Sequence, residues 1–163
     1  MNSADQKNAS RIHTVADAVT LARRRLPAPV FAYIDGAAGT ETTMGANREA
    51  LESVRFRPRM GITVGTEPRE LAVDLFGQRL SMPIIVGPVG FTRSMHPDGD
   101  AGGLAAAQRA NTAFCHSTMS GHSIEQLASP AGDAYWFQLY QLGGRQGAEQ
   151  LVERARKSII WIT

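Results

Sequence analysis

Small and hydrogen-bonding residues end three apolar runs in the second half of the sequence. Gly90 follows the first run, Ser117 ends the second, and Gln138 and Tyr140 close the third. Hydroxyl and amide groups can hydrogen-bond a planar polar ligand without adding formal charge. Gly90 has no side chain, so a flat ring could lie close to its backbone. The chemistry that these residues favour is the binding of a planar, polar ring system.

Phosphate-binding and acid–base groups are missing from the same positions. The sequence contains no Walker or GxGxxG phosphate loop, and no apolar run ends in an acid–base pair. His116 is the one titratable side chain there, and a lone histidine at a strand end is more often a packed, hydrogen-bonded residue. A zinc site from Cys115, His116 and His122 is a remote alternative, because adjacent strand residues point to opposite faces.

The apolar runs that carry these residues alternate with helical patterns. Continuous apolar runs fit strands buried on both faces, and we predict strands at 83–89, 113–117, 135–140 and 159–163. Helices are predicted between them, at 100–110, 123–128 and 146–157. A capping box of Ser123 and Gln126 opens the second of these helices.

This alternation is typical of a right-handed parallel α/β architecture, in which functional residues lie at the C-terminal ends of the strands. A complete (β/α)8 TIM barrel has about 250 residues, whereas the chain has 163. We therefore predict the N-terminal half of such a barrel.

A helical lead-in precedes the first predicted strand. Apolar residues at helical spacing predict helices at 15–26, 30–37 and 42–54, and Thr14 is the N-cap of the first. Alternation over 71–75 and a Gly77-Gln78 turn predict a small β-hairpin that closes at Leu80. The expected organisation is a flexible tail (1–12), a lead-in with a hairpin cap (13–82) and a truncated half-barrel (83–163).

Composition restricts the class of protein further. Hydrophobic residues make up 43% and charged residues 20%, and the formal net charge is +2. These values permit a buried core and give no support to nucleic-acid binding. No apolar run approaches the roughly 20 residues of a membrane-spanning helix, and the polar start is unlike a secretory signal. The single cysteine, Cys115, fits a reducing compartment, so we predict a cytoplasmic protein without an integral membrane segment or a metal site.

Short motifs follow one another in a specific order between about Val15 and about Lys157. Each motif is weak, but their order and spacing together are specific. They are Tyr33-Ile34-Asp35-Gly36-Ala37-Ala38, Asn47-Arg48, Arg55-Phe56-Arg57-Pro58-Arg59, Ser81-Met82-Pro83-Ile84, Gly87-Pro88-Val89-Gly90-Phe91, His96-Pro97-Asp98-Gly99, Ser117-Thr118-Met119-Ser120, Ser123-Ile124-Glu125 and Trp136-Phe137-Gln138-Leu139-Tyr140. In this order the chain resembles the FMN-dependent α-hydroxy-acid dehydrogenase and oxidase family, which includes L-lactate dehydrogenase, glycolate oxidase and mandelate dehydrogenase.

The resemblance implies an FMN site at the predicted strand ends. The backbone of Pro88, Val89 and Gly90 would lie against the flavin ring near its reactive nitrogen. Ser117 and Gln138 would hydrogen-bond the ring system. The flavin carries the electron chemistry in such enzymes, while the protein orients it and tunes its electronics.

The resemblance also implies a small 2-hydroxy-acid substrate, lactate-like and of L configuration, which is oxidised to the 2-oxo acid. Tyr33 would help to hold the substrate carboxylate. Tyr140 would bond the carboxylate or hydroxyl end and steady the developing oxyanion, which makes it the predicted catalytic residue of this chain. The Val89-Gly90 pair resembles the lactate and mandelate dehydrogenase branches, and full-length members are expected to be homo-oligomers.

Several functional parts of the family have no counterpart in this sequence. In the family a histidine removes a proton, an arginine clamps the carboxylate, a lysine stabilises the reduced flavin, and later loops bind the phosphate. We therefore expect a truncated form that is inactive by itself. Two alternatives stay open: a non-catalytic remnant or interaction fragment of such a barrel, and a different flavin- or phosphate-binding barrel, against which the 137–140 motif argues.

Overall fold

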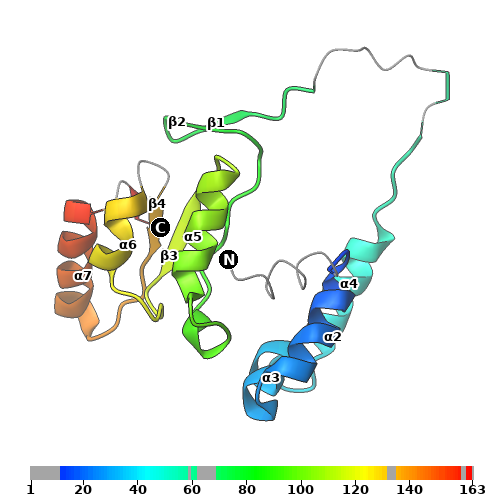
Figure 1. Ribbon diagram of the computed structural model, residues 1–163, viewed down its shortest axis with the longest axis horizontal. Coiled ribbons are helices and arrows are strands. Elements are labelled where there is room, and N and C mark those ends of the chain that lie inside the picture. The colour runs from blue at the N-terminus through cyan, green and yellow to red at the C-terminus, as the bar shows by residue number, and fades with distance from the viewer. Residues whose placement is uncertain (1–11, 59, 62–68, 132–134, 159–160, 163) are drawn as a thin grey trace. The chain divides into compact units, whose positions relative to one another are not determined.

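The computed structural model describes residues 12–58, 60–61, 69–131, 135–158 and 161–162. Two compact units, Met1–Thr66 and Glu67–Thr163, each have their own packing. Helices make up the described first unit, and the second unit is mixed α/β (Figure 1). The strands of the described residues do not close into a barrel. The three-part division expected from the sequence stays a prediction.

The first unit contains three helices that begin and end close to the predicted positions. They are α2 (Val15–Arg25), α3 (Ala28–Asp35) and α4 (Thr42–Ser53). The Thr14 hydroxyl accepts a hydrogen bond from the Asp17 N–H at 3.2 Å, and Asp17 accepts one from the Thr14 N–H at 2.9 Å. This reciprocal cap confirms the predicted start of α2. The prediction for α3 began two residues late, because a proline is tolerated in the first turn of a helix.

The second unit is built on a parallel sheet. Strands β3 (Phe114–Ser117), β4 (Tyr135–Gln138) and β5 (Trp161–Ile162) lie in the order β3-β4-β5, all parallel. Sequential order with helical connections is the arrangement predicted from the alternating pattern. An antiparallel hairpin of β1 (Val73–Leu75) and β2 (Gln78–Leu80) precedes the sheet and confirms the predicted hairpin.

The predicted strand at 83–89 was wrong in its length. Only Val86 pairs with the sheet, as an isolated parallel bridge to Phe114. Its N–H donates to the Ala113 carbonyl and its carbonyl accepts from the Cys115 N–H, both at 2.9 Å. Prolines at both ends of the segment lack the N–H that a ladder needs, so pairing does not extend from this bridge. The strand predicted at 135–140 is also shorter, because it ends at Gln138.

Three helices connect the strands: α5 (Gly99–Arg109), α6 (Ile124–Ala131) and α7 (Gly144–Ser158) (Figure 1). A short 3-10 helix, η1 (Thr92–Ser94), comes before α5. The Ser123 hydroxyl accepts from the Gln126 N–H at 3.2 Å, and the Gln126 amide oxygen accepts from the Ser123 N–H at 2.8 Å, which confirms the predicted capping box. The fourth predicted strand coincides with β5 at 161–162, and the rest of its range lies outside the described residues.

The two faces of the sheet have different partners because strand side chains alternate. Phe114, Tyr135 and Phe137 pack with apolar residues of α5, α6 and α7, and these helices cover that face. Cys115 and Trp136 point the other way and pack with Ala113 and with Leu80 of the hairpin. Val73 and Leu75, which are partly buried, pack against this cluster. The Trp136 indole N–H donates to the Gln78 side chain at 3.0 Å. We call the first the helix face and the second the hairpin face.

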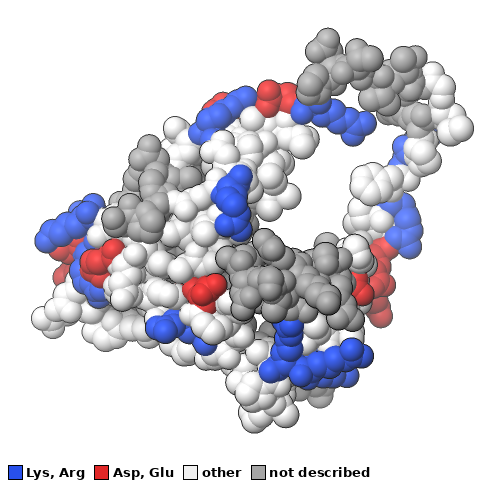
Figure 2. All heavy atoms as spheres, in the orientation of Figure 1, with Lys and Arg blue, Asp and Glu red and all other residues white. Residues whose placement is uncertain are grey.

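Charge is dispersed over the described surface. Figure 2 shows Lys and Arg side chains in separate groups on a largely uncharged face, several of them beside Asp or Glu. Arg154 and Glu125 form a bidentate ion pair, with both nitrogen–oxygen distances 2.8 Å. Among the described helices, none has the length and apolar character that a membrane crossing requires.

Candidate functional site

Two predicted cofactor residues meet at neighbouring strand ends. Ser117 ends β3 and Gln138 ends β4, and the parallel register places them directly opposite one another. Each lies two residues after a hairpin-face residue, Cys115 or Trp136, so both side chains point to the hairpin face and away from the helices. The Ser117 hydroxyl donates to the Gln138 amide oxygen at 3.4 Å. Ser117 is almost fully buried, while Gln138 is partly exposed. The result is a small polar patch at the carboxyl ends of two parallel strands.

Gly90 packs against the loop that follows β3, which we call the β3–α6 turn (117–120). A Cβ atom on Gly90 would lie 3.0 Å from the Cβ atom of Met119, closer than side chains normally approach. The next residue, Phe91, donates its N–H to the Met119 carbonyl at 3.0 Å. Met119 in turn donates its N–H to the Ser117 hydroxyl at 3.1 Å. A larger residue at position 90 would therefore have to displace the turn that positions Ser117.

The other predicted ring-contacting residues lie immediately before Gly90. Pro88 and Val89 follow the Val86 bridge in the chain, and the Val89 side chain is half exposed. An apolar side chain that stays half exposed at a strand end can contact a ligand ring. Pro88 and Val89 therefore belong to the same end of the described sheet as Gly90, Ser117 and Gln138.

Tyr140 lies two residues beyond β4, and its side chain is 52% exposed. Its backbone is held in place, because its N–H donates to the Thr118 hydroxyl at 3.0 Å. That hydroxyl donates to the Gln138 carbonyl at 2.5 Å. Thr118 thus ties the chain after β4 to the end of β3 and leaves the phenol of Tyr140 accessible.

His116 points to the helix face and does not join this patch. Its ring is buried and hydrogen-bonds the Tyr135 hydroxyl through Nδ1. Burial lowers the pKa of His116, although the Asp100 carboxylate and the His122 backbone carbonyl partly oppose this shift. Burial and the same carboxylate raise the pKa of Tyr135. His116 is a packed residue, as its isolation in the sequence indicated. The remote zinc site also lacks convergence, because Cys115 lies on the opposite face.

The buried imidazole predicts a pH-dependent stability. Folded His116 binds a proton less readily than the unfolded chain, whose histidine pKa is near 6.5. Stability is then complete above pH 6.5 and falls as the pH is lowered through it, by up to about 1.4 kcal/mol per pH unit. Denaturant melts between about pH 4.5 and 6.5 measure this slope. We expect His116→Asn, which keeps an acceptor near Tyr135, to flatten it.

Carboxylates contribute below this window. Arg154 lowers the pKa of Glu125 from 4.5 to about 2, so that stabilisation is lost only as the pH falls below 4.5. An unchanged slope in His116→Asn would contradict the assignment of the proton to His116.

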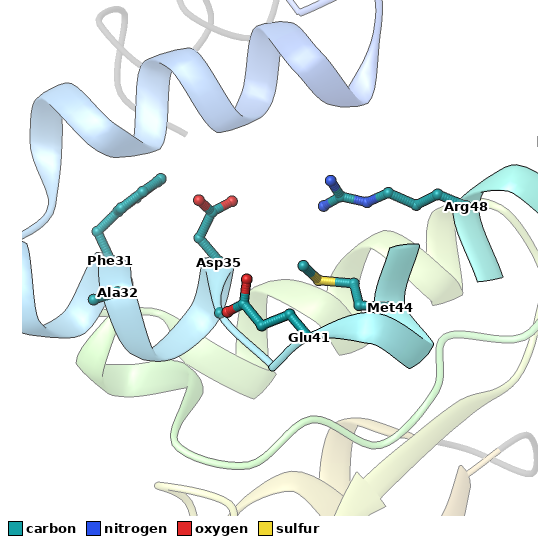
Figure 3. A pocket seen from close by; sticks show the side chains of 7 residues that line it. Phe31, Ala32, Asp35, Glu41, Met44 and Arg48 are labelled. Atoms are coloured by element: carbon teal, nitrogen blue, oxygen red, sulfur yellow. The ribbon is translucent and has the colours of Figure 1, made fainter. Parts of the chain in front are cut away.

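Tyr33 belongs to the first unit, on α3, and its side chain is 67% exposed. The same helix contributes to a hollow of about 450 Å³ between α3 and α4. Figure 3 shows the Asp35, Glu41 and Arg48 side chains around this hollow. Glu41 accepts from the Ala37 N–H at 3.0 Å, and Asp35 lies 3.6 Å from Arg23. The lining holds two carboxylates against the one guanidinium of Arg48, so the hollow carries negative charge and disfavours a carboxylate substrate.

Three residues that shape the patch had no individual role predicted from the sequence. Thr118 and Met119 were only members of a motif, and Asp100 was only the start of a predicted helix. Their importance depends on contacts across loops that sequence spacing does not reveal. An acidic residue in the first turn of α5 was the one available signal, and it is typical of ordinary helix starts.

Comparisons with known proteins agree with the motif pattern. The sequence profile of a family described as FMN-dependent dehydrogenase matches residues 22–161. The chain is 37% identical over 142 residues to 4-hydroxymandelate oxidase of Amycolatopsis orientalis, which covers 87% of this chain and 39% of that protein. It is 38% identical over 145 residues to L-lactate dehydrogenase of Pseudomonas syringae, which covers 89% and 38%.

Solved structures give the same result. A crystal structure of mandelate oxidase with 3,3-difluoro-2-hydroxy-3-phenylpropionic acid superposes with a TM-score of 0.81 at 35% identity, over 91% of this chain and 45% of that one. An (S)-mandelate dehydrogenase from Pseudomonas putida, solved as a soluble mutant of a membrane-associated protein, gives 0.82 at 35% identity, over 93% and 44%. The chain spans less than two fifths of the length of the 4-hydroxymandelate oxidase and the L-lactate dehydrogenase to which it is similar.

Proposed function

Because the chain belongs to the FMN-dependent dehydrogenase family, we propose that it supplies the N-terminal half of a (β/α)8 barrel that oxidises a small L-2-hydroxy acid. The observation that carries this proposal is the pairing of Ser117 with Gln138 at adjacent parallel strand ends. A lactate-like substrate is the specific form of the proposal. Cytoplasmic location stays a prediction, based on the single cysteine.

The residues present fit a flavin ring. The Gln138 amide oxygen accepts from Ser117, and among the described residues its NH2 group has no hydrogen-bond partner. That group can donate to a carbonyl oxygen of the ring, and Gly90 offers backbone without a side chain. When bound, FMN supplies the acceptor for the electrons of the substrate carbon. Pro88 and Val89 would then contact the ring face.

Two tyrosines are proposed to contact the substrate. The Tyr140 phenol is accessible beside the strand ends, on a backbone that Thr118 fixes. A phenol O–H can donate to a carboxylate or to an oxygen on which negative charge develops. Tyr33, whose side chain is largely exposed on α3, is proposed to hold the carboxylate. Both roles orient the acid relative to the cofactor.

The activity is proposed for the complete barrel. The chain matches less than two fifths of its curated relatives, and its sequence lacks the later lysine, histidine, arginine and phosphate loop that the family resemblance implies. We therefore expect the isolated chain to retain no FMN and to turn over no substrate.

Reconstitution tests this proposal. The chain is mixed with the separately produced remainder of the Pseudomonas syringae L-lactate dehydrogenase, and FMN is added. We expect the mixture, and neither part alone, to retain FMN on gel filtration and to lose oxidised-flavin absorbance when L-lactate is added. D-lactate is the matched substrate control. A mixture that associates but binds no FMN would contradict the proposed function.

A further inference from the structure

Asp100 is a buried acid in the first turn of α5. Its exposed fraction is 3%, although the nearby Asp98 side chain is 72% exposed. Burying a carboxylate is costly unless it is hydrogen-bonded. Its partner is the hydroxyl group of Ser120, which donates to Asp100 Oδ2. A buried acid of this kind holds in place the segment of the chain that provides its hydrogen-bond donor.

That segment is the β3–α6 turn. The Ser120 N–H donates to the Ser117 carbonyl at 3.0 Å, and the Ser120 hydroxyl accepts from the His122 N–H at 3.0 Å. Ser120 is therefore bonded to both arms of the turn and to Asp100. The turn also contacts Gly90 through Met119.

The Ser117 hydroxyl is held inside this arrangement. It accepts from the Met119 N–H at 3.1 Å, and it donates to Gln138 at 3.4 Å. If the turn moved, Met119 would move with it and the Ser117 hydroxyl would lose its acceptor role. The orientation of this hydroxyl therefore depends on the anchor between Ser120 and Asp100.

We infer that Asp100 is a positioning residue whose bond to Ser120 clamps the β3–α6 turn onto Gly90 and so aims the Ser117 hydroxyl at the proposed flavin site. Asp100 itself lies on α5, one of the helices on the helix face, and it acts through its hydrogen bond to Ser120. The flavin part of this inference rests on the proposed function. The clamp itself is a property of the chain.

Amide hydrogen exchange on the full chain tests the clamp. In Ser120→Ala we expect the amides of Met119, Ser120 and Phe91 to exchange roughly tenfold faster or more, because a hydrogen bond to a buried charge is lost. The amides of Phe137 and Ala155 should keep their rates. A purely global loss of stability would instead accelerate all of these amides together.

Four further variants complete the design. Ser120→Thr keeps the hydroxyl and should restore slow exchange, and Asp98→Asn removes an exposed acid of the same helix start and should change nothing. Asp100→Ala should accelerate the same amides, and the double variant should be no faster than the faster single variant, since both changes remove the bond between Ser120 and Asp100. Unchanged turn exchange in Ser120→Ala, or additive effects in the double variant, would overturn the clamp.

The flavin part has its own readout. In the reconstituted mixture, Ser120→Ala should weaken FMN retention about tenfold and alter the visible circular dichroism of the bound flavin, whereas Ser120→Thr should not. If the wild-type mixture binds FMN and Ser120→Ala binds it equally well, the positioning role is overturned. If the wild-type mixture binds no FMN, the proposed function fails, and the exchange rates still decide the clamp.

Discussion

Valine in place of Gly90 is expected to weaken FMN binding in the reconstituted barrel by roughly ten- to a hundredfold. The first added carbon would lie 3.0 Å from the Met119 Cβ atom, and two more methyl groups would follow in the same crowded space. Overpacking of this kind costs about 1–3 kcal/mol. Because FMN binding is proposed to require the native turn, the cost is set against binding, where each 1.4 kcal/mol corresponds to about tenfold in affinity. Because Met119 hydrogen-bonds Ser117, its displacement would also disturb the polar patch. Fluorescence titration with FMN measures the effect.

Gly87 offers a matched control in the same segment. A Cβ atom at Gly87 would meet no heavy atom within 4 Å, and the residue precedes a proline, where extended backbone is favoured. Gly87→Val should therefore leave FMN affinity within about twofold of the wild type. Equal FMN affinities for Gly90→Val and the wild type would contradict this prediction, because they would show that the β3–α6 turn can shift without weakening FMN binding.

Replacing Phe137 by alanine is expected to destabilise the second unit by about 3–5 kcal/mol, which is a large part of the stability of a small domain. Phe137 is 1% exposed and packs with the core residues of three helices. Its ring centroid also lies 5.9 Å from that of His116. The cavity would therefore remove contacts on both the sheet and the helix side. Both tryptophans, Trp136 and Trp161, belong to this unit, so tryptophan fluorescence during urea unfolding reports on it selectively.

Phe56→Ala is the same chemical change at a fully exposed position of the first unit. It should change the unfolding free energy by less than about 0.5 kcal/mol. A comparable loss of stability in both variants would mean that the packing of Phe137 against the helices is not the source of the effect.

The α/β alternation could be predicted from the sequence because its signals are local. The Ser123 and Gln126 capping box and the Thr14 cap each use side chains three residues apart, and both form as expected. The limits of the strands depend on partners. Val86 forms one bridge where a full strand was predicted, since prolines interrupt the ladder in a way that apolar content does not show.

The candidate site was predictable in part for a similar reason. The rule that strand ends carry function selected Ser117 and Gln138, and the register places them opposite one another. The same rule selected His116, which alternation turns to the helix face. Asp100 could not be recognised, because its burial depends on a serine twenty residues later that only the folded turn brings to it.

The hydrogen bond between His116 and Tyr135 also has a consequence for how β3 and β4 find each other during folding. If β4 paired one residue out of step, Tyr135 and Phe137 would turn to the hairpin face, and the amide of Gln138 would be pressed among helix residues. His116 would then be buried without its phenol partner, at a cost of about 1–3 kcal/mol. We therefore expect the pair to favour the native register of β3 and β4 over a register shifted by one residue. His116, which has no role in the proposed chemistry, thus helps to keep Ser117 and Gln138 together on the hairpin face.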